Sequence, residues 1–447
     1  MQFSPRLKSS PKRPGFHRIC TPEETYARVH PRLRDVGITR MSDITGLDRL
    51  GIPVWSSVVP KSRDILSVYN GKGSTHIGAK VGAIMEGVER SAGCTFTRPF
   101  LRGSFNSMSA RRRVLDPEVV GPVIHPQYTK DREILWTEGH DLFTGEEVLV
   151  PADAAGYNAP FCDDASVLAF AVSTTNGLAA GNTYEEAIAQ ALCELIERDA
   201  WTVAHVLAHW RPRAKFEGEL AKAGKPKHQW NPKDDQPFDD DADRYPIISP
   251  ETFTGEVREL YERFLLAELP PTMRDITSDI GVPTFVVSCM EDVSAEMPRA
   301  HLGLGTHQDP EVAAMRAFTE LAQSRVVDIQ GVREDMAGAD EKVSKYMSHA
   351  KRVSMISRRI WYHMDTANRR SMADVPAVSN DDTRDDVRAM LSALHENGLD
   401  VAVEVDVTNP VVGIPVTRVL VPGLESWAVD HGRVGKRGAR AWNLHRN

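Results

Sequence analysis

The sequence predicts an α/β protein whose sheets are mixed and mostly antiparallel. Short β-branched runs alternate with helical repeats along the 447 residues, so both kinds of element are expected. Several predicted strands follow one another without an intervening helix, which favours antiparallel pairing. The length exceeds the usual size of a single core, so we expect one composite domain with subdomains or two closely joined domains.

Changes in composition divide the chain into segments. Residues 1–20 are basic and contain prolines, so we expect a flexible tail, with a docking arm for an acidic partner as the alternative. Residues 21–435 form the main domain. Within it, residues 211–246 are rich in Pro, Lys and Asp, which predicts a surface insertion or mobile loop. Residues 436–447 are expected to be a C-terminal tail, and its last residues, RAWNLHRN, contain no proline.

The first predicted element is a helix over TPEETYARVHPRLRDVG. Thr21 can cap it, Pro22 suits its first turn, and Glu24 stands three residues after the cap. GIPVWSSVVP and DILSVYNGKG are expected to be strands because they are β-branched and bounded by Gly and Pro. A helix is predicted from about Thr75 to Ala92.

The rest of the chain continues this alternation. Residues 98–175 predict several strands, the last in VLAFAVSTTNG, and a helix follows over about 183–209. The next expected elements are the helix EVRELYERFLLAEL, the strand GVPTFVVSCM and a helix near 309–330. A mixed, partly helical stretch reaches residue 380. The helix DDVRAMLSALHENG and the strands DVAVEVDVT and IPVTRVLVP complete the predicted domain.

The bulk composition excludes some function classes. The net charge of -8 argues against a general nucleic-acid binder, which needs a basic surface. No apolar stretch approaches the length that spans a bilayer. The 5 cysteines are scattered without a C-x-x-C pair, which predicts neither a disulfide framework nor a zinc site and favours a reducing cytoplasm.

Two predicted helices share one acidic pattern. KVGAIMEGVERSA and IAQALCELIERDA align so that equivalent positions hold two glutamates and an arginine, and AAMRAFTELAQSR repeats the spacing in part. The equivalent residues are Glu86 with Glu194 and Glu320, Glu89 with Glu197 and Gln323, and Arg90 with Arg198. Residues at i, i+3 and i+4 lie on one helical face, so each set should project together.

The second helix extends the acidic face. Glu186, Gln190, Glu194 and Glu197 follow one another close to a single face. Such carboxylates repel one another unless cations lie among them, and Mg²⁺ with ATP phosphates meets that need. The structural alternative stays open: Glu and Arg at i, i+4 also form ordinary surface ion pairs, and Glu186 makes a T-x-x-E capping box with Thr183.

Small-residue turns precede both helices. NGKGST and NGLAAGNT lead into the helix N-termini, where backbone N–H groups suit phosphate. Neither turn matches the Walker A pattern, so a P-loop NTPase is not predicted. Lys72 can meet a phosphate, although a lone lysine is more often exposed to solvent.

The segments VYNGKGST…EGVER and STTNGLAAGNTYEEAIAQALCELIERDA resemble the YcaO family. The opening GITRMSDITGLDRLGIPVWSSVVP and the closing VLVPGLESWAVDHGRVGKR resemble the subgroup that works with TfuA-like proteins. The resemblance implies the family's own fold, with ATP and Mg²⁺ held at carboxylate-bearing helices. It implies metal ligands at Glu86, Glu89, Glu186, Glu194, Glu197 and Glu320, and nucleotide contacts from Lys72, Arg90, Gln190, Arg198, Arg316 and Gln323.

The chain departs from the family pattern at two positions. Gly82 stands where a serine is common, and Ala179 where a small hydroxyl or thiol residue is common. Each change can alter a nucleotide contact. Cys193 lies on the second motif helix and is expected to face the core, and no catalytic acid or base is assigned.

The resemblance implies ATP-dependent phosphorylation of a peptide amide oxygen, followed by sulfide attack to give a thioamide. The expected partners are a peptide or protein substrate, a TfuA-like protein and a sulfide donor, and the oligomeric state is left open between a monomer and a homodimer. Azoline cyclodehydration of a ribosomal peptide is one alternative, against which the proline-free end is weighed. A nucleotide-binding scaffold or regulator without transfer chemistry is the other.

Overall fold

The computed structural model describes residues 3–121, 123–226, 238–294, 297–331, 360–426 and 434–443. Its strands are β1 (Arg40–Asp43), β2 (Val54–Val58), β3 (Val68–Lys72), β4 (Leu101–Ser104), β5 (Glu133–Asp141), β6 (Glu147–Pro151), β7 (Leu178–Ala180), β8 (Ile247–Ile248), β9 (Thr272–Asp275), β10 (Thr284–Ser294), β11 (Met297–Thr306), β12 (Arg369–Arg370), β13 (Val403–Asp406) and β14 (Val416–Leu420). Its helices are α1 (Pro22–Val29), α2 (Leu33–Val36), α3 (His76–Thr95), α4 (Phe105–Ser109), α5 (Ala152–Ala155), α6 (Tyr184–His205), α7 (Arg211–Lys222), α8 (Gly255–Leu266), α9 (Pro310–Gly331), α11 (Thr383–Glu396) and α13 (Lys436–Asn443).

The strands form three sheets. Their orders are β1-β2-β3, β11-β10-β9-β8-β12 and β4-β5-β13-β14-β7, and β6 pairs with β5. All pairs between these strands are antiparallel except β8 with β12. The predicted α/β class with mostly antiparallel sheets is therefore confirmed.

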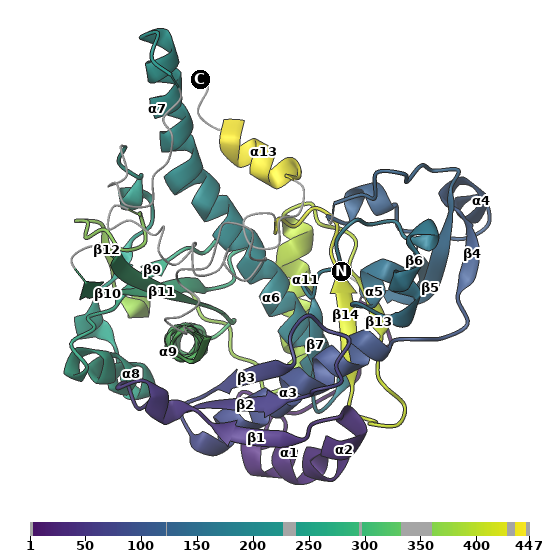
Figure 1. Cartoon of the computed structure of the whole chain (residues 1–447), viewed down its shortest axis with the longest axis horizontal. Coiled ribbons are helices and arrows are strands. Elements are labelled where there is room, and N and C mark those ends of the chain that lie inside the picture. Colours follow the sequence, from purple (N-terminus) through teal and green to yellow (C-terminus); the bar gives the residue numbers. More distant parts are fainter. Residues whose placement is uncertain are drawn as a thin grey trace.

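Three long helices connect the sheets (Figure 1). Helix α3 packs on β2 and β3, α6 on β7 and β14, and α9 on β10 and β11. Helix α6 also contacts β10 and β11, and α9 also contacts β3. The faces of α3, α6 and α9 that bear the predicted site residues are thus held close to one another by packing between the sheets.

The N-terminal helix is interrupted where the sequence places a proline. The capping box between Thr21 and Glu24 is present, but α1 ends at Val29 and a 3₁₀ turn over His30–Arg32 separates it from α2. Pro31 lacks the N–H that a continuous helix requires at this point. The prediction of one helix over residues 21–37 was wrong for this reason.

Residues 3–20, expected to form a flexible tail, lie along the protein body. The Ser4 N–H donates to the Leu142 carbonyl at 3.0 Å, and the Ser10 N–H donates to Asp382 at 2.8 Å. The Lys12 ammonium lies 2.6 Å from a carboxylate oxygen of Asp386, and both side chains are buried. Hydrogen bonds of this kind order the segment against α6 and α11.

Other segments also differ from expectation. Residues 211–222 of the predicted insertion form α7, which projects beyond the sheets as a continuation of α6 (Figure 1), whereas residues 227–237 lie outside the described ranges. Residues 436–443 of the predicted C-terminal tail form α13, and residues 444–447 are not described. VLAFAVSTTNG was predicted as a strand, but within it only an isolated bridge from Ile124 to Phe170 forms, and β7 begins at Leu178. Within the described ranges, no helix has the length and apolar character needed to cross a membrane.

Candidate active site

The predicted site is built from a strand–turn–helix unit that occurs three times. The unit consists of β3 with α3, β7 with α6, and β11 with α9. A side-chain oxygen caps each helix: Thr75 accepts from Gly78 N, Thr183 from Glu186 N, and Asp309 from Glu311 N. Each cap fixes the point where the helix begins, and therefore the face on which its acidic residues lie.

Glycines allow two of these helices to approach their strands closely. A Cβ atom on Gly71 would lie 2.0 Å from the Ala83 backbone nitrogen, and one on Gly305 would lie 2.0 Å from the Ala313 carbonyl oxygen. Gly71 precedes Glu86 by as many residues as Ala179 precedes Glu194 and Gly305 precedes Glu320. The three units therefore present their first acidic residue at the same level above the strand.

The two departures from the family pattern have structural settings. Gly82 faces β3, and a Cβ atom there would lie 3.3 Å from the Gly71 Cα. A serine at this position would press on the β3 backbone, so the glycine suits the close approach of α3. Ala179 is 1% exposed, occupies the place of Gly71 in its unit and pairs with Thr417 of β14.

One group of charged side chains joins α3 to α6. The Arg90 guanidinium lies 3.6 Å from Glu86 and 3.9 Å from Glu89, and Arg198 lies 3.5 Å from Glu194. Burial, with the neighbouring carboxylates of Glu194 and Glu86, raises the pKa of Glu89 well above its usual range. Glu89 and Glu194 thus face one another across the two helices, as the aligned motifs predict.

A second group joins α6 to α9 and β3. Glu197 is 6% exposed, and burial together with the Glu320 carboxylate raises its pKa to about 7. Lys72 forms an ion pair with Glu320. Although burial opposes ionisation, the Lys72 ammonium holds the pKa of Glu320 below its usual value. Lys72, predicted as a phosphate contact, is therefore paired with a predicted metal ligand in this structure.

Backbone N–H groups hold several of these carboxylates in place. Asn70 N donates to Glu86 at 3.2 Å and Leu304 N donates to Glu320 at 3.3 Å, so the first and third units use the equivalent contact. In the second unit Gly177 N donates to Glu194 at 3.2 Å. Gln323 lies beside these carboxylates, where its Nε2 donates to the Asn70 carbonyl at 3.1 Å.

Glu186 lies apart from both groups of carboxylates. Its side chain accepts hydrogen bonds from Ile19 N at 2.7 Å and Asn182 N at 2.8 Å. Its oxygens are thus used to hold the N-terminal segment and the turn before α6. This geometry favours a structural role for Glu186 over the predicted metal ligation.

A pocket of about 440 Å³ lies beside these groups, between α6, α9, α11 and the N-terminal segment. Two predicted nucleotide contacts, Gln190 and Arg316, line it together with Arg18. Cys193 and Met390 add an apolar wall, and Cys193 is otherwise buried in the core, where it was predicted. An apolar wall beside two arginines suits a flat base with an anionic tail.

Two histidines in this pocket escaped the sequence analysis. His17 and His307 meet edge to face, with ring centroids 5.8 Å apart. Burial, assisted by the charges of Arg18 and Arg316, lowers the pKa of His17 to about 3, so its imidazole is neutral. The signal was hidden because His17 belongs to a segment that was interpreted as a tail.

Asp64 and Tyr157 were also missed. The Tyr157 hydroxyl donates to Asp64 at 3.0 Å, and the Arg90 guanidinium lies over the Tyr157 ring, 5.6 Å from its centroid. The other Asp64 oxygen is buried and has no hydrogen-bond partner among the described residues. No sequence pattern links these residues, because they come from separate loops.

The arrangement suits divalent cations and phosphates. Carboxylates of α3, α6 and α9 raise the pKa values of their neighbours, and the buried Nε of Arg90 has no hydrogen-bond partner in the described ranges. Among the described residues, however, no three His, Cys, Asp or Glu side chains are grouped closely enough to hold a metal ion by themselves. The donor set therefore fits Mg²⁺ that takes further oxygen ligands from phosphates and water.

Comparison with known proteins gives consistent matches. The family model described as YcaO cyclodehydratase, ATP- and Mg²⁺-binding, matches residues 70–425. An uncharacterized protein of Methanothermobacter thermautotrophicus is 36% identical over 93% of this chain and 97% of its own length. A Rhizobium leguminosarum bv. trifolii protein, known by its position in the tfuA 3′ region, is 30% identical over 96% of this chain and 93% of its own length.

Solved structures match the fold. YcaO from Methanopyrus kandleri, bound with AMPPCP and Mg²⁺, is similar with a TM-score of 0.66 and 26% identity, covering 94% of this chain and 95% of that one. A heterocyclase in complex with substrate and cofactor is similar with a TM-score of 0.72 and 22% identity. That alignment covers 94% of this chain but 54% of the heterocyclase, so this chain spans about half of that protein.

Proposed function

Since this chain belongs to the YcaO family, we propose that it is an ATP- and Mg²⁺-dependent enzyme that phosphorylates a peptide-backbone amide oxygen and converts the amide to a thioamide. One observation carries the proposal: glutamates of α3, α6 and α9 face one another and raise one another's pKa values. Such a site favours bound cations and, through them, a triphosphate. The match to a relative bound with AMPPCP and Mg²⁺ supports the same cofactors.

The residues divide between metal and nucleotide. Glu86, Glu89 and Glu194 form one proposed group of Mg²⁺ ligands, and Glu197 and Glu320 form the other. Arg18, Gln190 and Arg316 line the pocket in which we propose the nucleotide lies. Bound Mg²⁺ supplies charge neutralisation to the phosphates, and Arg90 and Arg198 add positive charge beside the carboxylates.

An amide oxygen is a weak nucleophile, so positioning and charge neutralisation carry the reaction. The oxygen attacks the γ-phosphorus, the bond to ADP breaks, and the amide nitrogen loses its proton. Hydrosulfide then adds to the carbon. Phosphate leaves with the original amide oxygen, and the product is a thioamide.

Thioamide formation is proposed over its alternatives for one reason. The relative from the tfuA 3′ region is similar along nearly its whole length, which supports a TfuA-like partner and, with it, thioamidation. The cyclodehydratase description of the family model favours the second candidate, azoline formation, in which a Cys, Ser or Thr side chain of the substrate attacks the carbon instead of sulfide.

Intact-mass analysis separates these reactions. Candidate peptides encoded beside this gene are incubated with the protein, a TfuA-like protein, ATP, Mg²⁺ and sulfide. A thioamide adds the mass difference between sulfur and oxygen, whereas an azoline removes the mass of one water. An unchanged mass with every candidate, together with ATP turnover that ignores peptide, would contradict both and favour a nucleotide-binding scaffold.

A site variant completes the test. Glu197→Gln removes a buried carboxylate of the proposed site, and we expect peptide-dependent ATP turnover to fall at least about 100-fold. Glu256→Gln changes an exposed glutamate on α8 and should leave turnover at the wild-type level. Equal turnover in both variants would remove the site assignment.

A further inference from the structure

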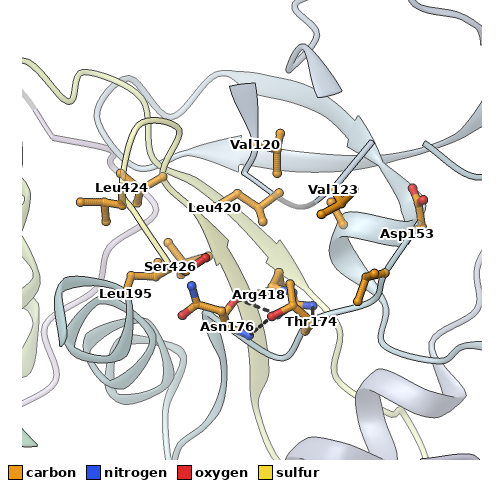
Figure 2. Close-up of a pocket in the computed structure, with 14 residues that line it drawn as sticks. Val120, Val123, Asp153, Thr174, Asn176, Leu195, Arg418, Leu420, Leu424 and Ser426 are labelled. Atoms are coloured by element: carbon orange, nitrogen blue, oxygen red, sulfur yellow. Dashed lines mark hydrogen bonds between the residues drawn. The ribbon is translucent and has the colours of Figure 1, made fainter. Parts of the chain in front are cut away.

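A second cavity lies beside the site, on the other side of the loop that precedes β7. Its empty volume is about 700 Å³, within the range of small-molecule and peptide-segment sites. Figure 2 shows Val120, Val123 and Leu420 on one side of it and Thr174 and Asn176 on the other. The walls are therefore apolar on one face and polar on the opposite face.

Two polar oxygens at this cavity lack hydrogen-bond donors. Oδ1 of Asp153 and Oδ1 of Asn176 are both buried and have no hydrogen-bond partner among the described residues. Asp153 is 8% exposed, and its other oxygen accepts from Ala169 N at 2.8 Å and Phe170 N at 2.9 Å. Buried acceptors are almost always paired in folded proteins, so these two favour a ligand that brings N–H donors.

Arg418 fixes the polar wall of the cavity. Its guanidinium is 1% exposed, donates to the Asn176 carbonyl at 2.8 Å and also donates to the Thr174 carbonyl (Figure 2). This cation is directed to the backbone of the loop rather than to the open space. The cavity therefore does not offer the exposed positive charge that a phosphate or carboxylate ligand needs.

The cavity and the acidic site share one wall. Asn176 lines the cavity, and the next residue, Gly177, donates its N–H to Glu194 at 3.2 Å. Leu195 of α6 also lines the cavity and follows Glu194 directly. A chain that occupies the cavity would thus lie one residue away from a proposed metal ligand.

We propose that this cavity receives an extended segment of the peptide substrate beside the amide that is activated, with Asn176 and Asp153 accepting its backbone N–H groups. The inference rests on the proposed function and adds a binding site for its substrate. An apolar side chain of the segment packs against Val120, Val123 and Leu420. A peptide meets both demands of the cavity, since it carries N–H donors and apolar side chains on one extended backbone.

Val172 provides a test that leaves the core intact. It lines the cavity and is 50% exposed, so a larger side chain there blocks the mouth without burying new volume. Val411 is 65% exposed in the loop between β13 and β14 and does not line the cavity, so Val411→Trp is the matched control. Thermal unfolding and AMPPCP affinity should be unchanged in both variants.

The probe is a pool of capped random decapeptides, selected for binding to the wild-type protein with AMPPCP and Mg²⁺. The best binder is then synthesised with a fluorescent label and its Kd is measured by anisotropy. We expect Val172→Trp to weaken peptide binding at least about tenfold and Val411→Trp to leave it unchanged. A photo-crosslinking residue at position 172 should also attach the peptide, and one at position 411 should not.

The outcomes separate this inference from the proposed function. Equal peptide affinity in Val172→Trp and wild type would overturn the cavity assignment while leaving the Glu197 test of ATP turnover unaffected. A pool from which the wild type retains no peptide would also overturn it. Loss of ATP turnover in Glu197→Gln together with unchanged peptide binding in Val172→Trp would keep the enzyme and reject this site.

Discussion

Lys72 of β3 forms an ion pair with Glu320 of α9, across 248 residues of sequence. The pair joins the first strand–helix unit to the third at the centre of the acidic site. The same ammonium also lowers the pKa values of Glu86 and Glu197, while burial raises them. Lys72 is thus the cation that lies nearest to both groups of carboxylates in the ligand-free protein.

Lys72→Gln should therefore weaken nucleotide binding in the presence of Mg²⁺. Without the ammonium, Glu320 and Glu197 repel each other more strongly, and one positive charge beside the phosphates is lost. We expect the Kd for AMPPCP with Mg²⁺, measured by calorimetry, to rise about tenfold, which is about 1.4 kcal/mol. Lys61→Gln, an exposed lysine outside the site, is the control. Equal affinities in the two variants would contradict a role for Lys72 at the nucleotide.

Gly71→Ala should destabilise the fold. The new Cβ would lie 2.0 Å from the Ala83 nitrogen and 2.2 Å from the Ala79 carbonyl oxygen, so α3 must move away from β3. Overpacking of this kind costs about 3 kcal/mol of unfolding free energy. Gly46→Ala meets no atom within 4 Å and serves as the control in urea denaturation. A Gly71→Ala protein as stable as Gly46→Ala would show that α3 does not need this close contact.

Lys12→Met tests whether the N-terminal segment belongs to the folded body. Its ammonium pairs with Asp386 at 2.6 Å, with the two side chains 11% and 8% exposed. Removing one partner leaves a buried carboxylate, which costs about 3 kcal/mol. AMPPCP binding should weaken as well, because His17 and Arg18 of the same segment line the nucleotide pocket.

Lys8→Met is the matched control for this change, since the Lys8 ammonium is exposed and donates to the Pro5 carbonyl. Thermal unfolding and calorimetry of both variants give the comparison. Should Lys12→Met behave as Lys8→Met in stability and in nucleotide affinity, residues 3–20 would be the tail that their composition predicts.

Asp153→Asn should change how stability depends on pH. Burial raises the pKa of Asp153 to about 7, although the Phe170 and Ala169 N–H groups oppose this. The folded state therefore binds this proton more tightly than the unfolded state, where the pKa is about 4. The contribution is present at pH 4 and is lost as the pH rises to 7.

An asparagine keeps one acceptor for the two N–H groups and does not titrate. Between pH 5 and pH 8, the unfolding free energy from urea titrations should thus fall less steeply in Asp153→Asn than in wild type. Parallel curves for the two proteins would show that Asp153 is ionised throughout this range.

The sequence predicted the acidic helices well because their information is local. Caps at Thr75 and Thr183 and the spacing of Glu86 with Glu89 define where each helix begins and which face it presents. The pairing of strands β13 and β14 also follows from two adjacent β-branched runs. These features depend on residues that are neighbours in the chain.

The sequence could not predict contacts between distant segments. The pairing of Lys12 with Asp386 and the hydrogen bond of Glu186 to Ile19 N place the N-terminal segment on α6 and α11, although its composition is that of a tail. Glu186 matched the acidic face of its helix by spacing, yet its oxygens are used by backbone N–H groups. Spacing along one helix does not reveal what lies opposite that helix.

The central claim is that glutamates from α3, α6 and α9 together hold Mg²⁺ and the phosphates of ATP. A crystal structure of this protein with AMPPCP and Mg²⁺ measures this directly. We predict metal ions contacting at least one carboxylate from each of the pairs Glu86 with Glu89, Glu194 with Glu197, and Glu320 with Lys72 displaced toward the phosphates. A nucleotide bound elsewhere, with these carboxylates still paired as in the ligand-free protein, would contradict the account.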